Sequence, residues 1–291
     1  GTLRVGLVGG STADTVDAHI PASASDAARV VNLYEPLVRR GYDYELENRL
    51  AESLEPNGDA TEWTIRLREG LKFSDGRPLR PEDVIATYER VGDPDDPKNG
   101  AGSIAHIESM SVVDDRTLTI SLSRPDATLT DALAEYQMGI VPEDYDPDNP
   151  IGAGPFKLVD FAAGRETVME RNEHYFLGPS NLDRVEVVDF YQEDAMLNAL
   201  LSSQVDGIGA LNHALVRVIE ADERLHVVSS ETGMWLPFTM RVDHEPFDDE
   251  RVRQAMRLAV RRPGMVDQVF SGEGQVGNDM FALYDPAYPH E

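Results

Sequence analysis

Cysteine is absent from the 291 residues, and basic residues are too few to balance the acidic ones. Without cysteine the chain can form no disulfide bond, hold no thiolate-bound metal and use no cysteine nucleophile. The 26 lysine and arginine residues face 53 aspartate and glutamate residues, which gives a net charge of −27 at pH 7. Because this charge repels nucleic-acid phosphates and anionic lipid, we expect neither as a partner.

Long apolar runs are missing too. No stretch approaches the roughly 18 consecutive apolar residues that predict a membrane-spanning helix. We expect no signal peptide within these residues, since residues 3–8 already have the composition of a strand, so any export signal has been removed or never existed. The chain is long enough to bury a sizeable core, and its length predicts two domains or one large one.

The usual signatures of catalysis are also lacking. There is no G-x-S-x-G nucleophile elbow and no H-E-x-x-H zinc motif, and the seven histidines are scattered. The acidic run that begins at Asp93 breaks the EF-hand pattern, because Pro97 takes the third ligand position. Residues 272–277 match G-x-G-x-x-G, but a dinucleotide site needs a strand before this motif and a helix after it, and we expect neither. We predict no catalytic residue, no metal site and no cofactor, which favours a binding protein.

Hydrophobic periodicity predicts a mixture of strands and helices. Alternating apolar residues indicate strands at residues 63–67, 118–122 and 185–190. A helix is expected to begin at Pro81, which two acidic residues follow in the first turn. An earlier helix ends or bends near Pro36.

The clearest predicted helix follows Asp248. Its apolar stripe consists of Val252, Ala255, Met256, Ala259 and Val260. Arg261 and Arg262 are expected to close it before Pro263.

Two acidic, proline-rich stretches, residues 92–100 and 142–150, predict breaks in the chain. The second is the better boundary, because the glycine-rich residues 152–155 follow it at once.

Four segments in order resemble the family 5 extracellular solute-binding proteins, the peptide- and nickel-type receptors of bacterial ABC importers. They are residues 50–84, which include W-T-I-R-L-R-E-G-L-K-F-S-D-G-R-P-L, residues 150–157, residues 199–207 and residues 246–274. The chain departs from the family pattern where Ala153 replaces the threonine of a G-T-G-P turn and Ser203 replaces a glycine. The resemblance covers nearly the whole chain.

This resemblance implies a mixed α/β fold. We expect a lobe like that of the type II periplasmic binding proteins, with an inserted small α+β subdomain. Full members are much longer, so the second large lobe is expected to be missing. The resemblance assigns residues 1–44 and 151–265 to the first lobe, residues 45–150 to the insert, and residues 266–291 to a truncated hinge.

The implied function is the capture of a small solute between two lobes and its delivery to the permease of an ABC importer. The commonest ligand class of the family is an oligopeptide or dipeptide, and the resemblance implies a monomer that works outside the cytoplasm. Any export signal or lipid-bearing cysteine would precede Gly1. Two alternatives stay open: a hydrolase or transferase that uses paired carboxylates, and a non-transport module that senses peptides.

By analogy with the family, the first-lobe face of the ligand cleft is built from loops at strand ends. The candidates for ligand contact are Gly10, Ser11, Leu211, Asn212, Met234 and Trp235. Trp235 is the most attractive, because an aromatic ring can stack on a side chain or a peptide plane. The competing interpretations are that Trp235 belongs to the core and that Gly10 only forms a turn.

Overall fold

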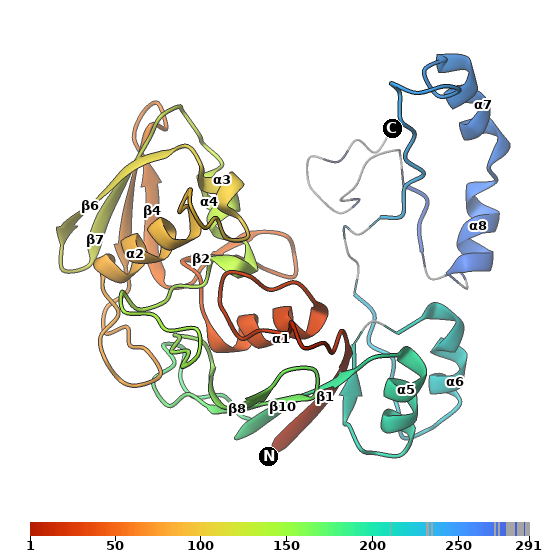
Figure 1. Ribbon diagram of the computed structural model, residues 1–291, viewed down its shortest axis with the longest axis horizontal. Coiled ribbons are helices and arrows are strands. Elements are labelled where there is room, and N and C mark those ends of the chain that lie inside the picture. Colours follow the sequence, from red (N-terminus) through yellow and green to blue (C-terminus); the bar gives the residue numbers. More distant parts are fainter. Residues whose placement is uncertain are drawn as a thin grey trace. The chain divides into compact units, whose positions relative to one another are not determined.

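The protein forms two compact units, Gly1–Ala210 and Leu211–Glu291, in a computed structural model (Figure 1). The structure describes residues 1–209, 211–230, 233, 235–270, 272, 274–277, 283 and 288, with the backbone alone at residues 214 and 217.

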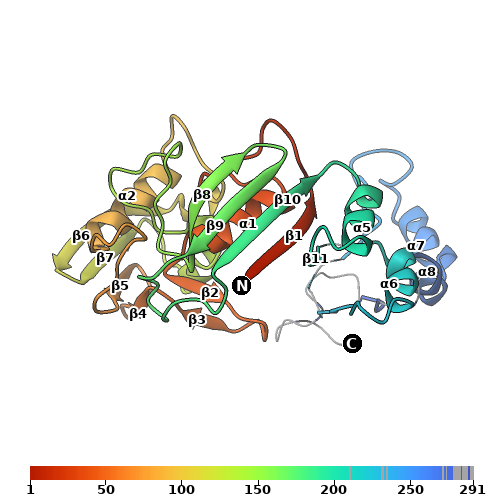
Figure 2. The same cartoon turned by 90° about the horizontal axis from the view of Figure 1, so that it is seen from below.

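The first unit contains a five-stranded sheet with strands from both ends of the unit (Figure 2). Its strands are β1 (Thr2–Val8), β8 (Phe156–Ala162), β9 (Glu166–Arg171), β10 (Arg184–Phe190) and β11 (Gly207–Ile208). The order is β11-β1-β10-β9-β8, with β1 parallel to β10 and β11, and β9 antiparallel to β8 and β10. β10 confirms the strand predicted at residues 185–190.

The first helix, α1 (Ala24–Leu33), is fixed at its start by a capping box. The Ser23 hydroxyl accepts a hydrogen bond from the Asp26 N–H, and the Asp26 carboxylate accepts one from the Ser23 N–H. The helix ends at Leu33, slightly before the predicted end near Pro36.

Helices cover both faces of this sheet. Val5 and Leu7 of β1 pack in one apolar core with residues of α1. Successive side chains of a strand point to opposite faces, so Gly6 faces the other way. A Cβ at Gly6 would lie 3.3 Å from Met196 of α5 (Glu193–Leu201), which places α5 on the face opposite α1.

A second, four-stranded sheet is antiparallel throughout. Its strands are β4 (Ala51–Pro56), β5 (Glu62–Leu67), β6 (Ile107–Asp114) and β7 (Thr117–Leu122), in the order β4-β5-β7-β6. β5 and β7 confirm the strands predicted at residues 63–67 and 118–122.

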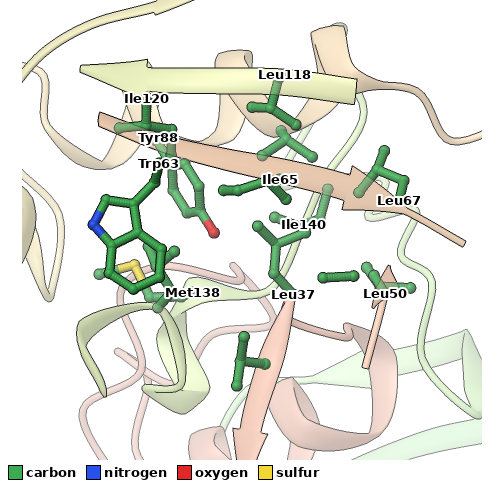
Figure 3. Packing of buried hydrophobic residues seen from close by; sticks show 14 of the residues in the cluster. Leu37, Leu50, Trp63, Ile65, Leu67, Tyr88, Leu118, Ile120, Met138 and Ile140 are labelled. Atoms are coloured by element: carbon green, nitrogen blue, oxygen red, sulfur yellow. The ribbon is translucent and has the colours of Figure 1, made fainter. Parts of the chain in front are cut away.

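One face of this sheet is buried in the larger apolar core. Trp63, Ile65 and Leu67 alternate with exposed residues along β5, and they point with Ile120 of β7 into this core (Figure 3). The helix α2 (Pro81–Val91) begins at the predicted Pro81 and contributes buried residues to the same core.

Shorter elements connect these parts of the first unit. They are β2 (Val38–Arg40) and β3 (Leu46–Asn48), which pair with each other, the helices α3 (Ala101–Ile104) and α4 (Leu129–Leu133), and the 3₁₀ turn η1 (Tyr136–Met138).

The glycine-rich turn at residues 152–155 packs directly on the end of α1. A Cβ on Gly152 would lie 2.1 Å from the Leu33 carbonyl oxygen, and one on Gly154 would lie 2.5 Å from the Asn32 carbonyl oxygen. Neither position can carry a side chain without backbone movement, which explains both glycines.

The second unit is helical where secondary structure is described. Its elements are the 3₁₀ turn η2 (His213–Leu215) and the helices α6 (Val216–Glu220), α7 (Glu250–Ala259) and α8 (Arg262–Val269). Among the described residues, no helix has the length and apolar character needed to cross a membrane.

The end of α7 corrects one prediction. Arg261 and Arg262 do not close this helix, which ends at Ala259, and Val260 is already extended. Arg262 instead begins α8, with Pro263 in the first turn, where the missing proline N–H costs no hydrogen bond.

The predicted division into lobe, insert and hinge stays a prediction. The five-stranded sheet draws its strands from residues 2–8 and 156–208, and the four-stranded sheet draws its strands from residues 51–122.

Candidate functional site

The carboxyl ends of three parallel strands lie at one edge of the five-stranded sheet. Gly9 follows β1, Tyr191 follows β10 and Gly209 follows β11. The turn at residues 163–165 lies at the same edge, because β9 is antiparallel to β10 and the Asp189 N–H donates to the Arg165 carbonyl. Open α/β sheets bind ligands outside the carboxyl ends of their strands, so this edge is the candidate site.

The predicted residue Gly10 lies at this edge in a position without room for a side chain. A Cβ there would be 2.9 Å from Cβ of Asp189 and 3.3 Å from the Gly164 carbonyl oxygen. Gly10 is largely buried, yet no described residue accepts a hydrogen bond from its N–H. Buried backbone N–H groups are rarely unpaired, so this N–H stands out at the edge.

The second predicted residue at this edge, Ser11, is held by Asp14. The Ser11 N–H and hydroxyl both donate to Asp14 Oδ1, at 3.0 and 3.2 Å, and the Gly164 N–H donates to Asp14 Oδ2 at 3.3 Å. One carboxylate therefore joins the loop after β1 to the turn between β8 and β9.

A fully buried arginine binds the Asp14 carboxylate. Arg29 of α1 donates from Nη2 to Asp14 Oδ2 at 3.4 Å and to Asp189 Oδ2 at 2.5 Å. Its Nη1 donates to Asp26 Oδ1 at 2.7 Å, and its Nε donates to the Thr167 hydroxyl at 2.7 Å. We call Arg29, Asp14, Asp26 and Asp189 the Arg29 cluster. With Thr167 of β9, this cluster links α1, β9, β10 and the loop after β1.

The Arg29 cluster holds three carboxylates around one guanidinium. Burial raises the pKa of Asp189, and the charges of Asp14 and Asp26 raise it further, whereas Ser25 and Arg29 oppose the rise. Among the described residues, no three histidine or acidic side chains are arranged to hold a metal ion. In this cluster the cation is the guanidinium itself.

The other predicted site residues fall in the second unit. Leu211 and Asn212 begin it, and Trp235 lies in an irregular stretch with 44% of its surface exposed. Met234 lies outside the described residues. That these four face the same cleft as Gly10 stays a prediction.

Two side chains at this edge, Tyr191 and Arg29, were not predicted from the sequence. Tyr191 is 71% exposed, and its one signal was its place directly after a predicted strand. Arg29 was not singled out either, because only Asp26 among its partners is near in the sequence, whereas Thr167 and Asp189 lie 138 and 160 residues away. The glycine motif at residue 272 follows α8 rather than a strand, so it lacks the context of a dinucleotide site.

Comparisons with known proteins point to one family. The family model of bacterial extracellular solute-binding proteins, family 5 Middle, matches residues 45–291. The chain is 24% identical over 275 residues to the glutathione-binding protein GsiB of Escherichia coli O6:K15:H31, covering 90% of this chain and 53% of that protein. It is 26% identical over 260 residues to heme-binding protein A of Haemophilus influenzae, covering 79% of this chain and 47% of that protein.

Solved structures agree with these relatives. The crystal structure of a nickel ABC transporter from Bacillus halodurans matches with a TM-score of 0.82 and 26% identity, covering 100% of this chain and 60% of that one. This match confirms the predicted mixed α/β fold class. The chain spans about half the length of the curated relatives it matches, and those relatives are binding proteins, not enzymes. The resemblance seen in the sequence is confirmed: the chain belongs to the family 5 bacterial extracellular solute-binding proteins.

Proposed function

We propose that the carboxyl edge of β1, β10 and β11 is one face of a binding site for a short peptide, which the complete protein delivers to an ABC permease. The Gly10 N–H is the observation that carries this proposal. It is a donor without a described acceptor, on a loop that Asp14 and Arg29 hold rigid. Rigid backbone donors suit a ligand that brings carbonyl acceptors of its own.

The relatives support a small solute more firmly than they support a peptide. Their names refer to glutathione, which is a short peptide, and to heme. We choose the peptide because the described edge offers backbone hydrogen-bonding groups and an aromatic ring, and the Arg29 guanidinium is already paired with three carboxylates. We further infer that the protein works outside the cytoplasm as a monomer.

The test is a thermal-shift series on the product of the complete gene. The probes are a casein hydrolysate, reduced glutathione, hemin and nickel–histidine. We expect the hydrolysate to raise the melting temperature, because a ligand that binds only the native state stabilises it by mass action. Stabilisation by hemin or nickel–histidine alone would overturn the peptide assignment.

A second readout tests the hydrolase alternative. Peptides recovered from the protein after prolonged incubation should have unchanged masses. Cleaved products, formed at a rate proportional to protein concentration, would favour the paired-carboxylate enzyme.

A further inference from the structure

We propose that Tyr191 contacts the ligand of this site and stacks its ring on a planar group such as a peptide bond. This inference rests on the proposed function and names one of its contact residues. Tyr191 lies in the short link between the end of β10 and the start of α5. At 71% exposure its ring is open to solvent, although the strand before it is largely buried.

The hydroxyl end of this ring lies where two other segments of the edge meet. A Cβ on Gly164 would be 3.1 Å from the Tyr191 hydroxyl and 3.1 Å from the Ser11 carbonyl oxygen. Gly164 has φ +73°, a left-handed conformation that favours glycine. A glycine here therefore lets the ring, the Ser11 loop and the β8–β9 turn come together.

Hydrogen bonds fix the two segments next to the Tyr191 hydroxyl, which are the Ser11 loop and the β8–β9 turn. Asp14 binds both Ser11 and Gly164, and Arg29 binds Asp14. The N–H of Asp189, two residues before Tyr191, donates to the Arg165 carbonyl at 2.9 Å. A ligand-contacting side chain gains affinity when its supporting groups are fixed before the ligand arrives.

The chemistry of the exposed group defines what it can recognise. A tyrosine ring offers a flat apolar face for stacking on peptide planes and aromatic rings. Within the described part of the chain its hydroxyl has no hydrogen-bond partner, so it can donate to a ligand carbonyl. Both features fit a peptide that also accepts from the nearby Gly10 N–H.

The chain offers a matched control in Tyr42. This tyrosine is fully exposed, at 102%, and it lies in the link between β2 and β3, which form a separate two-stranded sheet. Y191A removes the ring, Y191F removes only the hydroxyl, and Y42A removes an unrelated ring. All three should keep the wild-type melting temperature without ligand, because the removed atoms are exposed.

The experiment measures the concentration of casein hydrolysate that gives half of the full thermal stabilisation of the complete gene product. We expect Y191A to raise it about fivefold to tenfold, Y191F to raise it about threefold, and Y42A to leave it within twofold. Wild-type binding with an unchanged Y191A would overturn the Tyr191 assignment and leave the proposed function standing. No binding by the wild type would overturn the proposed function, and the assignment with it.

Discussion

At the scale of single residues, Gly10 lies where a side chain does not fit and where its backbone N–H has no described acceptor. It leaves room for Asp189, and it presents an N–H at the edge of the sheet. We predict that G10A lowers the free energy of unfolding by roughly 1–3 kcal/mol, because its Cβ would lie 2.9 Å from that of Asp189. Urea denaturation measures this change.

A matched glycine supplies the control for this prediction. A Cβ on Gly58 would meet nothing within 4 Å, so G58A should change the free energy of unfolding by less than about 0.5 kcal/mol. Equal effects of G10A and G58A would contradict the crowding argument.

Arg29 is the cation that pairs with the three buried carboxylates of the Arg29 cluster. We predict that R29M costs roughly 3–5 kcal/mol of folding stability, because three buried carboxylates lose their cation. R29K keeps the charge and should recover part of the loss. Chemical denaturation of both variants is the measurement, and R39M, which removes an exposed arginine paired with Glu47, is the control. A loss for R29M no larger than that for R39M would show that the Arg29 cluster is not a support.

At the scale of elements, a buried histidine links the segment between β1 and α1 to α2. His19 Nε2 donates to the Gly139 carbonyl at 2.9 Å, and its Nδ1 accepts from Arg90 of α2. Burial lowers the pKa of His19 to about 4, Arg90 and Lys98 lower it as well, and the Gly139 carbonyl and Asp17 oppose the shift. The neutral ring satisfies both neighbours, so protonation would disrupt the link.

The sign of the resulting pH dependence follows from linkage. An unfolded histidine has a pKa near 6.5, so between pH 6.5 and about 4 the unfolded chain binds a proton that the folded chain does not. Stability should therefore fall by about 3 kcal/mol as the pH drops through this window. Urea unfolding from pH 7.5 to 4 should show this loss, and H19Q should lose less over the same range. Parallel curves for the two proteins would contradict a buried neutral His19.

Elements with one buried face were predictable from the sequence, and elements defined by distant partners were not. Alternation revealed β5, because its three apolar residues face one core while their neighbours face solvent. The break between α7 and α8 was missed, because Arg261 and Arg262 have the charge typical of a helix end. Glycines 152 and 154 were recognised as a glycine-rich stretch after a predicted break, but their backbone contact with α1 leaves no pattern in the local sequence.

The site was predictable to the same degree. A loop after the first strand could be predicted, and Gly10 and Ser11 lie in the loop after β1; their contact with a ligand stays a prediction. The Arg29 cluster could not, because it joins residues 14, 29 and 189, which the sequence gives no reason to pair. Tyr191 needed the parallel register of β1 and β10, which places its strand end beside the Ser11 loop.

At the scale of the whole molecule, capture of a solute between two lobes requires contacts on both. A ligand shifts a closing equilibrium only by the difference between its affinities for the open and closed states. The chain spans about half the length of its curated relatives, and in the proposed site it supplies one face with a donor and a ring. We therefore predict that the 291-residue chain binds a casein hydrolysate at least tenfold more weakly than the complete gene product. Equal half-saturation in the two proteins would contradict capture between lobes.

Hydrogen–deuterium exchange on the complete gene product, with and without casein hydrolysate, tests most directly whether the carboxyl edge is the binding face. We predict slower exchange in peptides that contain residues 9–14, 163–165 and 191, and unchanged exchange around the control residue Tyr42. Slower exchange confined to other segments, with these three unchanged, would contradict the assignment of this edge as the solute-binding face.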